Sequence, residues 1–287
     1  MGSVNPQQQT HYFVPDASHW PLMGSAALFC LGLGAALAVN AIHVGYGVLG
    51  MGALILLTML VGWFRDVVNE GLRGAYQGKE DIAFRWGMGW FIFSEIMFFA
   101  ALFAALFYVR WVTLPTLGEF DYKMLYPDFV PNWPLSTAPD VTKPYQAVAV
   151  SGLPALNTLI LLTSGVTVTW AHWGMLNRKR GQLIGGLFAT VLLGIAFLAC
   201  QFAEYHHAIH QLNLSFSSGA YGMTFFMLTG FHGMHVLLGT IMLIVIATRA
   251  WRGHFDGDRH FAFEAVAWYW HFVDVVWLLL FLFVYWL

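Results

Sequence analysis

Seven long apolar runs limit the fold of this chain more than any other feature of its sequence. They cover residues 21–42, 44–64, 84–112, 154–176, 183–206, 220–248 and 263–287. A helix needs about 20 apolar residues to cross a bilayer core of about 30 Å. Backbone groups must be paired in hydrocarbon, and these runs lack the short alternating pattern of barrel strands. The expected fold class is therefore all-α: a polytopic membrane protein with seven transmembrane helices.

The composition agrees with a membrane protein and excludes one class of partner. Hydrophobic residues make up 59% of the chain and charged residues 10%, against about 25% charged residues in soluble domains. The formal net charge is −2, and no basic patch is interleaved with exposed aromatic residues, so we expect no nucleic-acid binding. Residues 1–20 are polar and contain no Lys or Arg, which argues against a signal peptide.

The basic residues predict the orientation of the helices. Ten of the 13 Lys and Arg residues lie in the connections after the second, fourth and sixth runs. Basic residues favour cytoplasmic loops. The N-terminus is therefore predicted to be cytoplasmic and the C-terminus extracytoplasmic. We expect a single domain made of a cytoplasmic segment 1–20, helices 1 and 2 within 21–64, a cytoplasmic link 65–83, helix 3 at 84–112, an extracytoplasmic loop 113–153, and helices 4–7 within 154–287.

Glu95 is the most unusual residue of the third run. Between Arg85 and Arg110 lie 24 residues, and Glu95 is the only charged one. A charged side chain at the centre of a membrane helix costs at least about 2.5 kcal/mol. We expect Glu95 to face protein and to be protonated or paired. Two roles stay open: a proton-exchanging, carbodiimide-reactive acid, or a neutral acid that hydrogen-bonds two helices together.

Two histidine motifs in the fifth and sixth runs suggest metal sites at first sight. Glu204 and His207 have the E-x-x-H spacing of a di-iron helix, but a di-iron site needs a second such pair, so a polar outer helix end in contact with water is favoured. His232 and His235 lie in the stretch GFHGMH. The flanking glycines favour close helix packing with histidine–backbone hydrogen bonds over haem or copper ligation. We expect no metal site in the chain.

The last helix carries a polar stripe. Glu264, His271 and Asp274 fall on one helical face, and this face should turn toward the bundle as part of an intramembrane hydrogen-bond network. The expected members of that network are Glu204, His207, His232, His235, Glu264, His271 and Asp274.

Basic side chains at the predicted cytoplasmic helix ends suit anionic lipid head groups. Arg65 follows Trp63 at the end of the second helix, with Glu70 beyond it, and Arg249 and Arg252 end the sixth helix. Ordinary snorkelling of basic side chains to the interface is the alternative.

Seven segments resemble one family. They are HWPLMGSAALF (19–29), WFRDVVNEG (63–71), FRWGMGWFIFSEIMFFAALF (84–103), LPALNTLILLTSGVTVTWAHW (153–173), QFAEYHHA (201–208), YGMTFFMLTGFHGMHVLLGT (221–240) and HFAFEAVAWYWHFVDVVW (260–277). Together they resemble cytochrome c oxidase subunit III of the haem-copper oxidases, and the long 113–153 loop looks bacterial.

The resemblance implies an accessory subunit of a proton-pumping terminal oxidase in a bacterial inner membrane. A hairpin of helices 1–2 would be separated from a bundle of helices 3–7 by a lipid-filled cleft. The chain would hold structural phospholipids but no catalytic residue and no redox centre. Haems and CuB would lie in subunit I, CuA in subunit II, and cytochrome c would donate electrons to the complex.

The resemblance also implies roles for residues. The family's membrane glutamate matches Glu95, and its lipid-contacting positions match Trp63, Arg65, Glu70 and Arg249. The subunit would stabilise subunit I and support proton uptake during oxygen reduction. Three alternatives stay open: a quinol oxidase subunit III, which usually has five helices; a proton-coupled transporter that uses Glu95; and a haem or metal protein that uses His232, His235 and His271.

Overall fold

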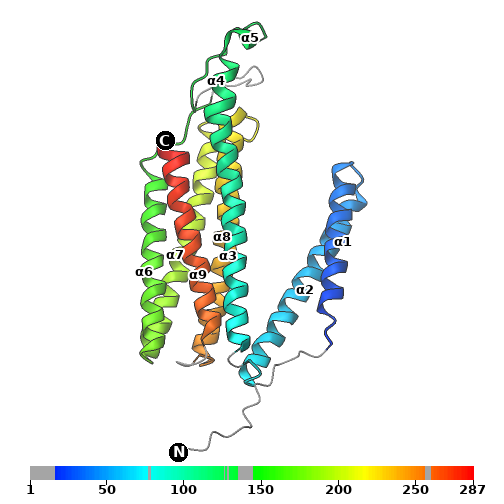
Figure 1. The fold of residues 1–287 in the computed structure, drawn as a ribbon, viewed down its shortest axis with the longest axis vertical. Helices are drawn as coiled ribbons and strands as arrows, with labels where there is room; N and C mark the ends of the chain where they lie inside the picture. The colour runs from blue at the N-terminus through cyan, green and yellow to red at the C-terminus, as the bar shows by residue number, and fades with distance from the viewer. Residues whose placement is uncertain (1–16, 77–78, 126, 128, 135–144, 256–259) are drawn as a thin grey trace, which may run out of the picture. The chain divides into compact units, whose positions relative to one another are not determined.

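The computed structural model of the chain describes residues 17–76, 79–125, 127, 129–134, 145–255 and 260–287. These residues form helices and no strand (Figure 1). Seven spans are long and apolar enough to cross a membrane, which confirms the predicted fold class. The α-helices of these spans are α1 (Trp20–Val39), α2 (Val44–Leu72), α3 (Lys79–Tyr108), α6 (Leu153–Leu176), α7 (Arg180–His210), α8 (Gly219–Trp251) and α9 (Phe261–Leu280).

Two spans continue beyond their α-helices. The third passes from α3 through a π-helical turn, η1 (Val109–Thr113), into α4 (Leu114–Leu117), and the short α5 (Phe120–Lys123) follows. The last passes from α9 into η2 (Phe281–Trp286). The helix therefore reaches into the start of the loop predicted at 113–153; residues 135–144 of that loop lie outside the described residues.

The helices α2 and α3 take up most of the link predicted at 65–83. The apolar run ends at Phe64, but α2 continues to Leu72, and α3 begins at Lys79 rather than Phe84. The backbone stays helical where its side chains become polar, because hydropathy reports the hydrocarbon boundary and not the end of the helix. Glu80 and Asp81 lie in the first turn of α3, where negative charge is favourable toward the helix dipole.

The chain divides into two compact units, residues 1–84 and 85–287. In the first unit α1 and α2 form a hairpin whose backbones come very close. A Cβ added to Gly34 would lie 2.6 Å from the amide nitrogen of Leu49, and one added to Gly45 would lie 2.6 Å from that of Ala38. Small residues permit such contact between membrane helices, so the glycines fix the register of the hairpin.

Polar contacts near the other end of the hairpin supplement this packing. The indole Nε1–H of Trp20 donates to Asp66 Oδ2 at 2.9 Å, and the ring lies against Gly62, which has no side chain to obstruct it. Beyond α2, the Tyr76 hydroxyl donates to Glu70. Burial, followed by this hydrogen bond to a carboxylate, raises the pKa of Tyr76 above its ordinary value.

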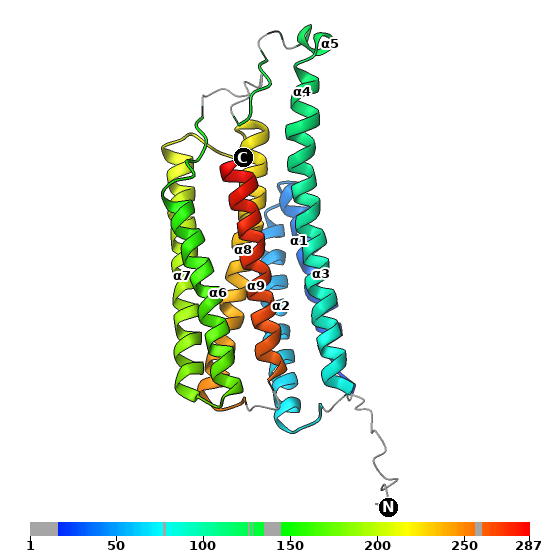
Figure 2. The same cartoon turned by 60° about the vertical axis from the view of Figure 1, so that its left-hand side comes forward.

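In the second unit α6, α7, α8 and α9 pack side by side (Figure 1 and Figure 2). The largest side chains at their centre are Trp270 and Trp277, both 0% exposed. Each indole N–H has a partner on α6: Trp270 donates to Ser164 Oγ at 2.9 Å, and Trp277 to Thr158 Oγ1 at 3.0 Å. Buried indoles are thus both packed and hydrogen-bonded, as their polar N–H requires.

The α3 helix joins the second unit through aromatic residues. Phe99 packs on Phe272 of α9 with 6.1 Å between ring centroids, and Phe103 packs on Phe283 at 6.0 Å. These two ring contacts place the middle of α3, and with it Glu95, against the bundle.

Candidate functional site

Glu95 meets a histidine from another helix. Its Oε2 lies 3.0 Å from Nε2 of His235 on α8. Nδ1 of the same ring lies 2.7 Å from the carbonyl oxygen of Phe231. A carbonyl can only accept, so Nδ1 carries a proton and donates it. Between Nε2 and Oε2 there is room for one further proton, which belongs either to the glutamic acid or to the imidazole.

Apolar rings surround the histidine of this pair. Phe99 lies 5.0 Å from the His235 ring and Tyr269 lies 6.3 Å from it, centroid to centroid. The His235 side chain is 6% exposed and that of Glu95 is 22% exposed. The histidine end of the pair is therefore buried and the glutamate end is partly open. Both sequence interpretations of Glu95 stay open, because the pair joins two helices and both of its members are ionisable groups.

His232 makes contacts of its own. It is 0% exposed, its Nε2 donates to the carbonyl oxygen of Val273 at 3.2 Å, and its ring lies beside Trp277. The two histidines of GFHGMH thus have different partners. A histidine–backbone hydrogen bond was expected for each, and each makes one.

The polar stripe of α9 separates into two clusters. Asp274 Oδ2 lies 3.4 Å from His271 Nδ1, and His271 Nε2 lies 3.2 Å from Thr169 Oγ1 on α6. Glu264, one end of the stripe, instead pairs with Arg85 of α3 and with His260. The sequence predicted one continuous face because it could not show which side chains of α3 and α6 meet each end of it.

Glu204 and His207 do not form a site together. Glu204 is 1% exposed, and its Oε1 accepts a hydrogen bond from the Tyr285 hydroxyl at 2.6 Å. His207 is exposed, and no hydrogen bond or ion pair of its side chain is found among the described residues. The expected water-exposed helix end is therefore wrong for Glu204, because η2 covers it.

The lipid-binding candidates fall in both units. Arg249 is half-buried, with its guanidinium carbon 4.7 Å from the centre of the Phe255 ring. Its buried Nε has no hydrogen-bond partner within the described part of the chain. Arg252 caps α8 and is exposed. In the hairpin unit Trp63 and Arg65 are exposed, and Glu70 accepts the hydrogen bond from Tyr76 described above.

Sequence reasoning missed several partners of these groups. His172 and Tyr285 supply contacts from distant positions, and nothing in the local sequence indicates them. His260 was detectable, because it precedes Glu264 by four residues and so lies one helical turn away.

The chain is similar to known proteins over almost its whole length. A family model described as cytochrome c oxidase subunit III matches residues 10–287. The chain is 40% identical over 280 residues to cytochrome c oxidase subunit 3 of Danio rerio, covering 97% of this chain and 98% of the relative. It is 38% identical over 280 residues to that of Arabidopsis thaliana (97% and 97%), and 40% identical over 288 residues to that of Marchantia polymorpha (99% and 98%).

Proposed function

The chain belongs to the cytochrome c oxidase subunit III family, and from this we propose that it is the accessory subunit of a proton-pumping terminal oxidase. It contacts subunit I, which holds the haems and CuB, within a complex that also contains the CuA-bearing subunit II. Cytochrome c donates electrons to that complex. The chain itself contributes no catalytic residue and no redox centre. It lies in a bacterial inner membrane with its N-terminus in the cytoplasm and its C-terminus in the periplasm.

The observation that carries the functional part of this proposal is the Glu95–His235 pair. Glu95 Oε2 and His235 Nε2 lie at hydrogen-bond distance, and His235 Nδ1–H donates to the Phe231 carbonyl oxygen. A buried site that holds one exchangeable proton can donate it and reload without moving the backbone. We infer that this pair supports proton uptake by the complex while oxygen reduction proceeds in subunit I.

Phospholipid binding is the second part of the proposal. The half-buried guanidinium of Arg249 has a ring on one face and an unpaired Nε within the described residues. A lipid phosphate would supply the missing acceptor through a charge-assisted hydrogen bond. Arg65 and Trp63 offer an exposed cation and aromatic ring on α2 for the same purpose. The cleft expected between helices 1–2 and the bundle stays a prediction.

Two alternatives have less support. A quinol oxidase subunit III usually lacks the helix 1–2 hairpin, which is present here. A haem or metal protein using His232, His235 and His271 would need ring nitrogens that face one centre, whereas these three rings bond to different groups: the Val273 carbonyl, the Phe231 carbonyl and the Thr169 hydroxyl.

The proton role is tested by Glu95→Gln in the intact oxidase complex. The amide N–H of glutamine can still donate to His235 Nε2, so the complex should assemble, but an amide cannot release a proton. We expect slower proton uptake in stopped-flow measurements with a pH dye, together with normal haem spectra. Ser94→Ala is the control, because the Ser94 hydroxyl bonds only to the Phe91 carbonyl of its own helix. A normal rate of proton uptake in an assembled Glu95→Gln complex would show that the Glu95–His235 pair serves only as a packing contact.

Labelling by a hydrophobic carbodiimide tests the same pair independently. This reagent attacks neutral carboxylic acids, and Glu95 is partly accessible. We expect it to react ahead of Glu264, which is held by Arg85, and ahead of Asp274. Labelling that spares Glu95 in the intact membrane would contradict the proposed protonated, accessible state.

The lipid role is tested by replacing one arginine at a time in the complex. Arg249→Gln should lower the number of phospholipids that copurify, measured by native mass spectrometry. Arg178→Gln is the matched control for charge, because Arg178 is exposed and is not one of the lipid-binding candidates. Equal lipid content in the two variants and in the wild type would favour snorkelling over specific binding.

A further inference from the structure

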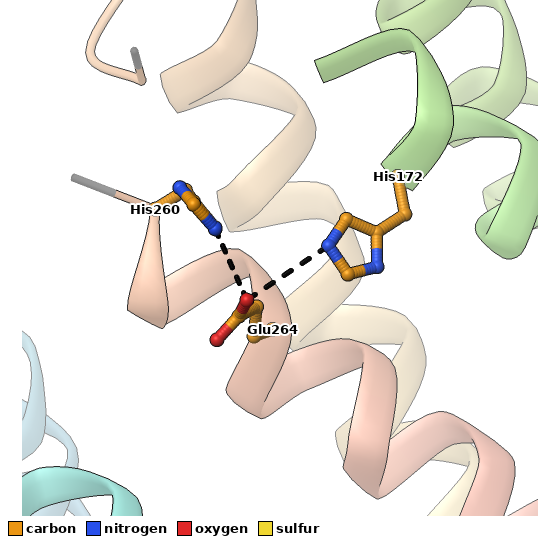
Figure 3. Close-up of side chains that lie close together, drawn as sticks. All are labelled: His172, His260 and Glu264. Carbon is orange, nitrogen blue, oxygen red and sulfur yellow. Dashed lines mark hydrogen bonds and ion pairs between the residues drawn. The ribbon is translucent and has the colours of Figure 1, made fainter. Parts of the chain in front are cut away.

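A second group of ionisable side chains lies at one end of the bundle, apart from Glu95. His172 belongs to the last turns of α6, His260 directly precedes α9, and Glu264 lies in the first turn of α9. Figure 3 shows both imidazoles directed at the same carboxylate. One ring nitrogen of each histidine and one carboxylate oxygen of Glu264 all lie within 4.8 Å of one another.

The spacing of these atoms suits a small cation at their centre. His260 Nε2 lies 3.0 Å and His172 Nε2 lies 3.9 Å from Glu264 Oε1. Zinc bonds of about 2.0–2.1 Å in a tetrahedral arrangement place neighbouring ligand atoms about 3.4 Å apart. The two observed distances lie on either side of that value. Side-chain rotations that move the ligand atoms by a few tenths of an ångström would therefore complete the tetrahedral geometry.

Two ring nitrogens of the group, His172 Nε2 and His260 Nδ1, lack a hydrogen-bond partner among the described residues. Nε2 of His172 is buried and has no hydrogen-bond partner among the described residues, since 3.9 Å is too long for a hydrogen bond to Glu264. A buried, unpaired nitrogen is costly. An ion placed between it and the carboxylate would remove that cost.

The donor atoms favour zinc over the other common divalent ions. Two imidazoles and one carboxylate form a set that is found at zinc sites with one open position, whereas Mg²⁺ and Ca²⁺ prefer oxygen ligands alone. Arg85 bonds to Oε2 of Glu264, which leaves Oε1 for the ion and orients the carboxylate, as outer-shell partners do. The positive charge of Arg85 opposes a second cation nearby, and this favours an exchangeable ion over a permanent one.

We propose that His172, His260 and Glu264 form a binding site for one exchangeable zinc ion, which ties α6 to α9. Without zinc, His260 Nε2–H donates to Glu264. When zinc binds, that proton moves to Nδ1 and the neutral ring coordinates through Nε2. A water molecule completes the fourth position. Sequence spacing could indicate the His260–Glu264 pair but not the third ligand, because His172 comes from a distant segment.

The test uses the intact, chelator-treated oxidase complex and Zn²⁺ alone as the probe. Equilibrium dialysis counts the zinc bound by the wild type, by His172→Ala and by His260→Ala. We expect each variant to lose one zinc per complex, or to bind it more than about tenfold more weakly, since even outer-shell changes cost about 10–100-fold. His43→Ala is the control, because His43 is an exposed histidine of the hairpin unit. The same zinc count in the wild type and both variants would overturn the proposal.

A second measurement covers the case in which a variant assembles poorly. Zinc K-edge X-ray absorption of the wild-type complex, loaded with one equivalent of zinc, should show two imidazole neighbours and one oxygen from the protein. A spectrum without imidazole would overturn the proposal by itself. Neither readout depends on electron transfer or proton uptake, so failure here and failure of the proposed oxidase role are distinguishable.

Discussion

The hairpin and the bundle differ in the side chains that they bury to hold membrane helices together. The buried residues of α1 and α2 are all small: Ala27, Gly34, Gly45 and Gly52. The bundle instead buries tryptophan, tyrosine and phenylalanine, and pairs their polar atoms. Lipid tails are as apolar as side chains, so close packing and hydrogen bonds must drive association in both units. The hairpin depends mainly on glycines that let the backbones approach, and the bundle adds large buried rings to glycine contacts of the same kind, such as Gly174 against Leu183.

This difference predicts that truncating a side chain harms the bundle most. Trp270→Ala should lower the free energy of unfolding by about 3–5 kcal/mol, the range for removal of a large buried side chain. It also leaves Ser164 without its donor. Reversible unfolding in mild detergent measures the change. Trp268→Ala, two positions away on α9 and 38% exposed, is the control and should cost much less. Equal losses at the two positions would show that the rings do not form a core.

Enlarging a side chain should harm the hairpin. In Gly45→Leu the new Cβ would lie 2.6 Å from the Ala38 nitrogen and 2.8 Å from the Gly34 oxygen, so the helices must separate. We expect a cost of about 1–3 kcal/mol, as for overpacking. Hydrogen exchange should rise in α1 and α2 and stay unchanged in α6–α9. In Gly47→Leu the Cβ meets nothing within 4 Å, and exchange should match the wild type. If both variants behave alike, close backbone approach does not hold the hairpin.

The smallest effect is expected for the exposed hydrogen bond of the hairpin. Trp20→Phe removes the bond to Asp66 and should cost about 0.5–1.5 kcal/mol, the usual net value of one hydrogen bond. The unfolding assay used for Trp270 measures it. Ser25→Ala is the comparison, because the Ser25 hydroxyl bonds only to the Pro21 carbonyl within α1. A loss as large as that of Trp270→Ala would mean that the hairpin has a polar anchor as important as the core of the bundle.

The sequence predicted where the helices are better than where they end. Apolar runs located all seven spans, since hydrocarbon requires paired backbone groups along its whole depth. The apolar pattern did not indicate that α2 extends from Phe64 to Leu72, because a helix can continue outside hydrocarbon with polar side chains. Likewise, Arg110 and Val112 looked like a helix end, whereas the span continues through η1 and α4 to Leu117.

The partners within the candidate sites were harder to predict. Glu95 stood out because it is alone in an apolar run, but its partner His235 lies 140 residues away. Spacing rules apply along one helix, so they cannot join α3 to α8 or α6 to α9. For the same reason the E-x-x-H spacing could not indicate His172, because His172 and Glu264 lie on different helices.

The length of chain between the partners that pair inside the bundle sets the order in which they can form during synthesis. Tyr285 follows Glu204 by 81 residues, and ribosomes add about 5–20 residues per second, so the carboxyl exists for roughly 4–16 s before its donor does. Glu95 precedes His235 by 140 residues and exists without its partner for about 7–28 s at that speed. Gly34 and Gly45, by contrast, can meet as soon as α2 is made. The hairpin can close while translation continues, whereas the acids of α3 and α7 are made before the groups that hydrogen-bond to them.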